Sequence, residues 1–238
     1  MPSLPAPLAA SAERFFGRSA TVAAVEDLSP GLRKATFAVP TLARRPWTMG
    51  QEIEIRASAR DMRHYTIAGV DPSTGDIDVV FALHADGPGT AWARALSVGD
   101  GFELLGPVGS VRRRAGRREL FLGDASTLGL FAALLPTAGS AYGAVEVPAA
   151  DVDAATAFVP GLDVLTAQDQ PGAALREWLH EHHPAVAPTG SAAAAPTRAC
   201  LAGHGQTIQA LRSRLRLLGV PRSTCATKPH WATGRRGL

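Results

Sequence analysis

The character of this sequence changes at one arginine-rich segment, and the change limits the chain to a two-part fold. Before the segment, six short apolar runs are separated by Gly, Pro and Ser turns, which is typical of a small closed antiparallel barrel. After it, short apolar strands alternate with amphipathic helices, which predicts a mainly parallel sheet. We therefore expect an N-terminal arm over residues 1–18, a six-stranded Greek-key β-barrel over 19–112 and an α/β domain over 118–238.

The individual elements follow from the same patterns. The expected barrel strands are ATVAAVEDLS, LRKATFAVP, QEIEIRAS, RHYTIAGV, the run from Asp76 to His84, and GFELLG. In the second domain the expected strands are LFLGD, YGAVEVP, GLDVLTA and ACLAGH, and the expected helices are STLGLFAALLP, AALREWLHEHH and QTIQALRSRLRLLG. The low-complexity residues 184–197 are expected to form a surface loop, and the arginines of 112–118 either a solvated linker or a patch that attracts anions.

Composition excludes several kinds of partner. A net charge of +3 does not argue for nucleic-acid binding. The cysteines, Cys200 and Cys225, lie far apart in the sequence, and no His or Cys cluster has metal-ligand spacing, so we expect no protein-bound metal. Residues 125–145 carry no charge, but Gly and Pro interrupt them, so we expect a buried helix and strand rather than membrane insertion. The start of the chain lacks a signal-peptide pattern, and we expect a cytoplasmic monomer.

The run Arg63, His64, Tyr65 and Thr66 is the first candidate for a ligand site. Because strand side chains alternate between faces, Arg63 and Tyr65 are expected to share one face and Thr66 to lie on the other. An arginine beside an aromatic plane suits a flavin, whose ring stacks on the plane and whose pyrophosphate accepts from the guanidinium. The alternative is an ordinary barrel strand with one exposed arginine.

A Gly-Pro-Gly-Thr turn at residues 87–90 follows the strand that ends at His84, and a helix is expected to start near Thr90. The first N–H groups of a helix have no intrahelical partner and lie at its positive end, so this turn is suited to a phosphate. The alternatives are that Thr90 is only an N-cap, Trp92 only a core residue and His84 an interior histidine.

At these residues the chain resembles the siderophore-interacting protein family, bacterial ferric-siderophore reductases built like ferredoxin-NADP reductases. The family pattern is Arg-x-Tyr-Thr, a strand ending in His, Gly-Pro-small-small-x-Trp-Ala, Gly-Asp and Gly-Pro, and all of these follow in order between Arg63 and Pro107. Ala68 departs from it, since many members carry a second Arg there. The resemblance implies that FAD is bound by Arg63, His64, Tyr65, Thr66, Ala82, His84, Pro88, Gly89, Thr90, Ala91 and Trp92.

The second domain resembles the nicotinamide-nucleotide part of the same family. Ligands of parallel sheets bind beyond the carboxyl ends of the strands, where this chain has Gly-Asp-Ala-Ser at 123–126 and Ala-Gly-His at 202–204. The family has Gly-Asp-Glu-Thr and Ala-Gly-Glu, so Ala125 and His204 replace two carboxylates, and NADH, NADPH and a reduced protein stay open as electron donors. The terminal KPHWATGRRGL resembles Tyr-Trp-Arg-x-Gly. The residues implied for the nucleotide are Asp124, Ser126, Gly203 and Trp231.

The resemblance implies an FAD-dependent ferric-siderophore reductase that passes electrons from NADPH or NADH through the flavin to chelated Fe(III). We expect Arg56, Lys228, Arg235 and Arg236 to attract the anionic chelate. Helical arginines Arg212, Arg214 and Arg216 are expected to be solvated, with the alternative that one reaches an NADP phosphate. Two other functions stay open: a flavin- or siderophore-binding protein without turnover, and a flavin-free interaction protein.

Overall fold

The computed structural model describes residues 17–83, 86–109, 111, 118–182 and 198–235. The chain divides into two compact units, residues 1–112 and 113–238, which are described separately here. Strand β1 begins at Arg18, and residues 1–16 of the predicted arm lie outside the described residues, as do His84, the arginines of 112–117, the loop 184–197 and Arg236.

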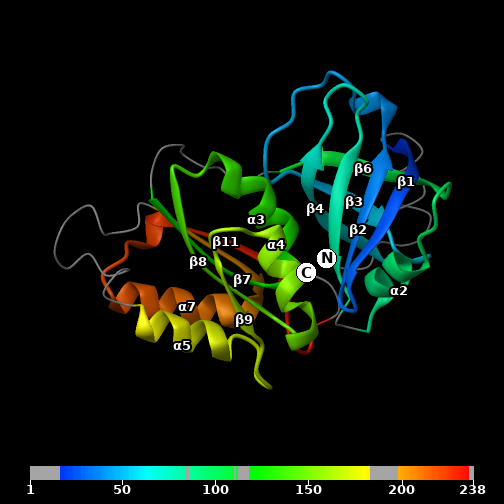
Figure 1. The fold of residues 1–238 in the computed structure, drawn as a ribbon. Helices are drawn as coiled ribbons and strands as arrows, with labels where there is room; N and C mark the ends of the chain where they lie inside the picture. Colours follow the sequence, from blue (N-terminus) through cyan, green and yellow to red (C-terminus); the bar gives the residue numbers. More distant parts are fainter. Residues whose placement is uncertain (1–16, 84–85, 110, 112–117, 183–197, 236–238) are drawn as a thin grey trace. The chain divides into compact units, whose positions relative to one another are not determined.

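The first unit is a closed antiparallel barrel of six strands, as predicted (Figure 1). Its strands are β1 (Arg18–Ser29), β2 (Leu32–Ala38), β3 (Glu52–Arg56), β4 (Met62–Val70), β5 (Ile77–Ala82) and β6 (Gly101–Val108). They are ordered β1-β2-β5-β4-β3-β6, and β6 pairs back to β1. The 3-10 turn η1 (Pro40–Leu42) follows β2, and helix α2 (Pro88–Ala95) lies between β5 and β6. Closure pairs every strand on both sides and so removes exposed sheet edges.

Alternate residues of the barrel strands fill its interior, as the period of two requires. In β5, Ile77, Val79 and Phe81 are almost completely buried, and Ile53 and Ile55 of β3 join them. Helix α2 is held to this barrel at its C-terminal end, where the Arg33 guanidinium donates to the carbonyls of Ala93 and Arg94 at 3.0 and 2.8 Å. The start of α2 is thereby kept beside the barrel.

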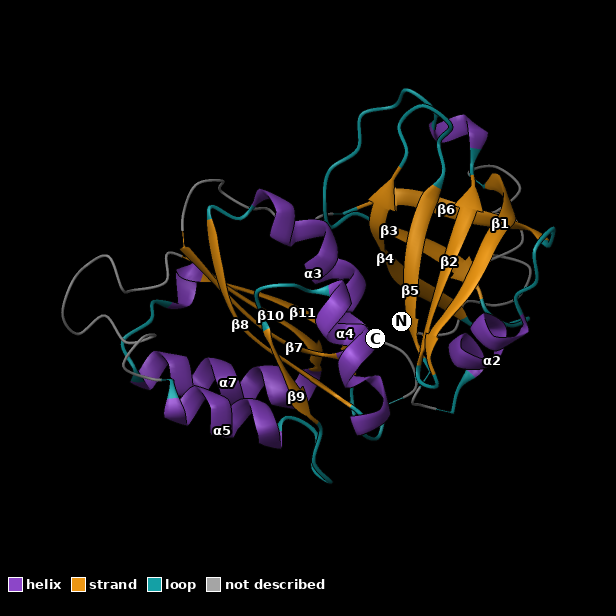
Figure 2. Cartoon of the chain, in the orientation of Figure 1, coloured by secondary structure: helices purple, strands orange, loops and turns teal. Residues whose placement is uncertain are grey.

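The second unit is a five-stranded parallel sheet with helices on both faces (Figure 2). Its strands, ordered β11-β10-β7-β8-β9, are β7 (Arg118–Asp124), β8 (Ser140–Val147), β9 (Asp163–Thr166), β10 (Arg198–His204) and β11 (Cys225–Trp231). Its helices are α3 (Leu128–Leu134), α4 (Val152–Phe158), α5 (Ala173–Glu181) and α7 (Gly205–Leu217), with short 3-10 turns η2 (Ala125–Thr127), η3 (Leu135–Thr137), η4 (Ala149–Asp151) and η5 (Arg222–Thr224). Helices α5 and α7 pack on one face and α3 and α4 on the other.

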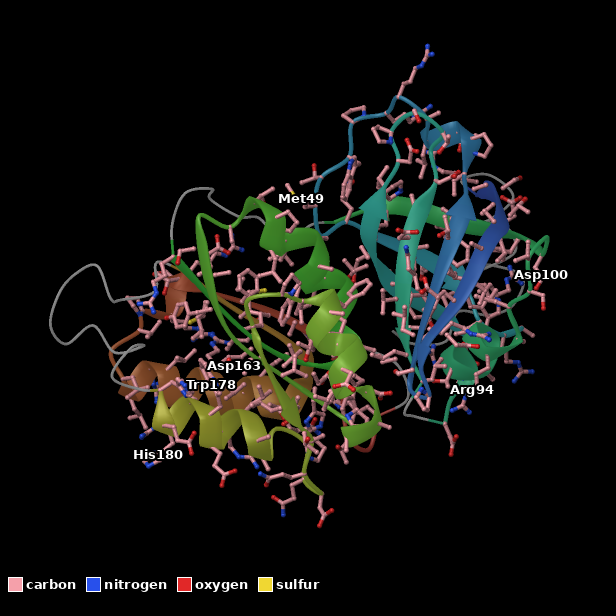
Figure 3. All side chains as sticks on the ribbon, in the orientation of Figure 1. Met49, Arg94, Asp100, Asp163, Trp178 and His180 are labelled. Carbon is pink, nitrogen blue, oxygen red and sulfur yellow. The ribbon has the colours of Figure 1, made fainter. Side chains whose placement is uncertain are left out.

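Polar contacts complete the apolar packing of these helices. The Trp178 indole of α5 donates to the Asp163 carboxylate of β9 at 2.6 Å, and both side chains are labelled in Figure 3. The ring of His182 stacks on Trp178 with centroids 4.3 Å apart. Arg118, the one described member of the predicted arginine cluster, lies 4.0 Å over the Tyr142 ring instead of standing in solvent.

Two elements of the second unit have no strong sequence signal. Helix α4 is only seven residues long and buries only Ala155, so it presents no apolar stripe. Strand β11 contains Pro229 and Lys228, which are unfavourable in a central strand but are tolerated at the sheet edge, where β11 lies. No helix in the described ranges is long and apolar enough to cross a membrane.

Candidate cofactor site

Strand β4 and the first turn of α2 come together at Gly89. A Cβ atom at Gly89 would lie 2.5 Å from the Tyr65 hydroxyl oxygen and 3.5 Å from Cγ of Arg63. The β3–β4 register pairs Ile53 with Tyr65 and Ile55 with Arg63, which puts Arg63 and Tyr65 on one face as predicted. A larger residue at position 89 would displace the Tyr65 hydroxyl, because the tyrosine packs against the helix backbone there.

The start of α2 offers backbone donors and no competing acid. Its N-cap is Gly87, which has no capping side chain, Pro88 is in the first turn, and no acidic residue lies in that turn. The helix thus begins two residues before Thr90, and the alternative that Thr90 is the N-cap is wrong. Pro88 has no N–H group that needs an acceptor. The other unpaired N–H groups at this end of the helix can donate to a bound anion. Ala91 is exposed one residue further on.

Arg63 adds positive charge beside this helix start. Its Nη1 donates to the Met62 carbonyl at 2.8 Å, and its Nη2 lies 3.6 Å from the Asp61 carboxylate. These contacts hold the guanidinium of the 24%-exposed side chain near Met62 and Asp61, while Cγ of the same side chain lies beside Gly89. An arginine side chain that passes beside open helix N–H groups is suited to a phosphate.

The other face of β4 carries buried polar atoms that lack partners. Thr66 is 8% exposed, and its hydroxyl has no hydrogen-bond partner among the described residues. Both ring nitrogens of His64 are also buried without a hydrogen bond, although the Glu54 carboxylate lies 3.5 Å from Nε2. Buried polar groups are normally satisfied, so this face fits a ligand with polar edges, such as a flavin ring.

Tyr65 and Trp92 contribute largely to the barrel core. The Tyr65 ring packs edge to face on Phe81 with centroids 4.7 Å apart, and its burial raises the pKa of the phenol to about 12. Trp92 makes ring contacts with Phe37, Phe81 and Phe102 at 5.3 to 6.2 Å. For Trp92, the alternative that it is a core residue therefore matches the packing. Ala82 is the last residue of β5 and pairs with Leu32.

In the second unit, the carboxylate of Asp124 joins three segments at the carboxyl edge of the sheet. Oδ1 accepts from the backbone N–H and hydroxyl of Ser126 at 2.9 and 2.5 Å. Oδ2 accepts from the His204 N–H at 2.7 Å and the Trp231 indole at 2.9 Å. Gly203 has a φ of 97°, and a Cβ there would overlap the Asp124 carboxylate. The predicted residues Asp124, Ser126, Gly203 and Trp231 thus meet at one point.

His204, which stands where the resembled family has Glu, is built into the same network. Its Nδ1 lies 2.8 Å from the Thr207 hydroxyl and its Nε2 3.0 Å from the Thr233 hydroxyl. Its ring packs on Trp231 with centroids 4.3 Å apart. Burial lowers the pKa of His204, although the Asp124 charge opposes that shift. Both ring nitrogens are thus within hydrogen-bonding distance of threonine hydroxyls.

The remaining predicted residues fall in different units. Arg56 ends β3 in the barrel, whereas Lys228 lies in β11 and Arg235 follows it in the second unit. His230, at the family's Tyr position, has Nδ1 3.0 Å from the Ser126 carbonyl oxygen. In the parts of the chain that the structure describes, no group of three or more His, Cys, Asp or Glu is arranged to hold a metal ion.

Glu146 is a residue of this edge that the sequence interpretation missed. It is 5% exposed at the end of β8 and pairs in register with Asp124 of β7. Oε1 accepts from the Gly172 N–H, while Oε2 has no partner among the described residues. Burial raises the pKa of Glu146, and the nearby Asp124 charge adds to the shift. The strand-end rule that selected Asp124 also applies to YGAVEVP and would have found this residue.

This raised pKa predicts a pH-dependent stability. The pKa of Glu146 in the folded state exceeds the ordinary value of 4.5. Below pH 4.5 the group is protonated and does not reduce the free energy of unfolding, but this free energy falls as the pH rises through the folded-state pKa. Glu146→Gln keeps an acceptor for Gly172 but cannot ionise, so we expect a smaller loss of unfolding free energy between pH 4.5 and 8. Urea titrations at several pH values measure this. Glu181→Gln, at an exposed position, is the control. If the unfolding free energy of the wild type and of Glu146→Gln changed with pH in the same way, the prediction would be contradicted.

The two units together define a class of fold. A barrel followed by a parallel five-stranded sheet is the architecture of the ferredoxin-NADP+ reductase from Plasmodium falciparum, which is 11% identical, with a TM-score of 0.70 over 90% of this chain and 96% of that chain. A siderophore utilization protein from T. fusca has a TM-score of 0.73 at 20% identity, over 93% of this chain and 95% of that one. The siderophore-interacting protein SipS from Aeromonas hydrophila has a TM-score of 0.72 at 22% identity, over 93% of each chain.

Within that class, the sequence match is more specific. Residues 54–111 match the family model described as the siderophore-interacting FAD-binding domain. This segment contains β4, β5, α2 and β6, and so covers the whole of the Arg63–Gly89 arrangement. The resemblance stated from the sequence is thereby confirmed. A comparison with curated proteins gave no match.

Proposed function

We propose that this chain is an FAD-dependent ferric-siderophore reductase that takes electrons from NADPH or NADH and acts as a cytoplasmic monomer. Residues 19–112 are the FAD-binding domain and 118–238 the NAD(P)H-binding domain. The observation that carries the proposal is the convergence of Arg63 and Tyr65 on the start of α2, inside the segment that matches the siderophore-interacting FAD-binding family model.

The residues of the barrel fit FAD on the features described above. Arg63 and the open N–H groups at Gly89 and Thr90 would hold the pyrophosphate, since they combine a fixed cation with the positive end of a helix. Thr66 and His64 would supply hydrogen bonds to the polar edge of the ring, because their buried atoms otherwise lack partners. When bound, FAD accepts a hydride from a nicotinamide and passes single electrons to Fe(III), and reduction weakens the hold of hard oxygen ligands on the iron.

The nucleotide would bind at the carboxyl edge of the parallel sheet, near Asp124, Ser126 and Gly203. Here Asp124 fixes the ends of β7, β10 and β11 together, and the rings of His204 and Trp231 pack on each other. Ser126 would contact the nucleotide through its hydroxyl only after that group turns away from Asp124. Arg56, Lys228, Arg235 and Arg236 would raise the local concentration of anionic chelate.

A visible absorbance experiment tests the reductase. The purified protein is expected to be yellow, to be bleached by NADPH or NADH under anaerobic conditions, and to recover its colour when a ferric tris-hydroxamate chelate is added. The iron-free chelate is the control and should restore nothing. A colourless protein that does not take up added FAD would rule out the function.

A binding protein without turnover is the second candidate. The replacement of two family carboxylates by Ala125 and His204, with both His204 nitrogens already engaged by threonines, favours it. The same experiment separates the two functions, because a yellow protein that neither nicotinamide bleaches has FAD but no working donor site.

A further inference from the structure

A basic pocket that the proposed reductase does not use lies on the second unit. It has a volume of about 270 Å³ and is formed by α7 from Gln209 onward, the turn after it, η5 and the start of β11. Arg212, Arg216 and Arg222 line it, and Val220 and Cys225 contribute apolar surface. The volume is just below the ~300–1,000 Å³ typical of small-molecule sites, so the pocket suits a compact ligand.

The three arginines have no acidic counterpart. Arg212 and Arg216 are four residues apart on α7, so their side chains are neighbours, and like charges at this spacing are unfavourable. No Asp or Glu follows Glu181 in the sequence, and no carboxylate is paired with these guanidinium groups in the described residues. Cations in the last helical turn do favour the helix dipole, which accounts for Arg216. Arg222 lies beyond the helix, after Pro221, so the helix dipole does not explain why Arg222 lines the pocket with the other two arginines.

This pocket is separate from the proposed nucleotide site. Strand β11 begins at Cys225, in the pocket, and ends at Trp231, which contacts Asp124. Seven strand residues extend about 20 Å. Helix α7 likewise starts beside His204 and lines the pocket only from Gln209 onward. Arg212 and Arg216 therefore point to a second anion site, not to the NADP phosphate contact considered from the sequence.

We propose that Arg212, Arg216 and Arg222 form a binding site for a diphosphate group. Guanidinium forks bind phosphate oxygens in pairs, and three forks from two elements match the several oxygens and charges of a diphosphate. Gln209 and Ser213 add neutral hydrogen-bonding groups to the wall. The apolar surface of Val220 and Cys225 would meet the organic part when the diphosphate belongs to a larger molecule. This proposal does not depend on the reductase function.

Calorimetric titration of the full-length protein, as purified, with inorganic pyrophosphate tests the site, and ADP serves as an organic diphosphate. We expect saturable binding that weakens about tenfold or more in Arg216→Gln. Arg214→Gln is the matched control, since Arg214 lies on the same helix but does not line the pocket. Tighter binding of ADP than of pyrophosphate, lost in Arg216→Gln, would assign the site to an organic diphosphate, and the reverse order to the free anion.

The rate at which Cys225 is alkylated reports whether a ligand occupies the pocket. Only two cysteines are present, and Cys200 is 2% exposed, so neutral iodoacetamide should label Cys225 in the folded protein. Burial raises the pKa of the Cys225 thiol, so labelling is slow and its rate is easily followed. Pyrophosphate should slow it in the wild type and Arg214→Gln but not in Arg216→Gln. The proposal is overturned if no saturable binding occurs, if both variants weaken equally, or if Cys225 is not protected.

Discussion

Replacing Asp124 by alanine is expected to destabilise the second unit by about 3 kcal/mol or more, because each buried donor left without an acceptor costs about 1–3 kcal/mol. The substitution removes the acceptor of the His204 N–H and the Trp231 indole, which lie on the two strands beyond β7. Urea titration followed by hydrogen exchange in β7 and β10 peptides measures the loss.

Asp169→Ala is the matched control, since Asp169 is an exposed aspartate of the same unit. Its effect should stay within about 0.5 kcal/mol of the wild type. Asp124→Asn should fall between the two, because its amide keeps one acceptor oxygen but sets an NH₂ group against existing donors. A stability of Asp124→Ala equal to that of the control would show that the network at this edge is reorganised without cost.

Arg63→Ala is expected to weaken FAD binding about 10- to 100-fold, because a hydrogen bond to a charged group contributes about 1.5–3 kcal/mol. The loss should appear as a lower flavin content after purification and as a higher Kd when FAD is added back to the apoprotein. Fluorescence quenching of the added flavin measures that Kd.

Arg60→Ala is the control for charge, since Arg60 lies in the same β3–β4 hairpin but is exposed. The two variants change the net charge equally. Retention of FAD by Arg63→Ala at the level of Arg60→Ala would remove Arg63 from the site. It would leave the buried polar atoms of Thr66 and His64, on the opposite face of β4, which have no hydrogen-bond partner among the described residues, as candidates for the cofactor contact.

These predictions separate the parts of the proposed reductase. The Arg63 variant tests the barrel and its cofactor, whereas the Asp124 variant tests the integrity of the nucleotide edge. Unchanged FAD binding in the Arg63 variant would contradict flavin binding at α2. Failure of the second would contradict only the assignment of Asp124 as the group that fixes three strand ends.

Many of the strands, helices and motifs of this protein could be predicted from short stretches of its sequence. The strands RHYTIAGV and LFLGD show their character in their own residues, because burial of alternate or successive apolar side chains leaves a period along the chain. The Arg63–Thr66 motif and the turn before α2 were also identified from their own residues, and the structure brings Arg63 and Tyr65 of the motif to Gly89. Two elements with weak patterns were not predicted. These are the short helix α4 and the strand β11, whose Pro229 is tolerated only because β11 lies at the sheet edge.

The sequence by itself determined the two-part architecture and the segment that matches an FAD-binding family, since periodicity and turn chemistry depend on neighbours along the chain. Only the tertiary structure decided which distant groups meet. Asp124 accepts hydrogen bonds from residues 80 and 107 positions away, and Glu146 stands beside it because β8 pairs with β7. These contacts depend on the order in which strands pair. That order is set by the packing of the whole unit, and no local pattern contains it.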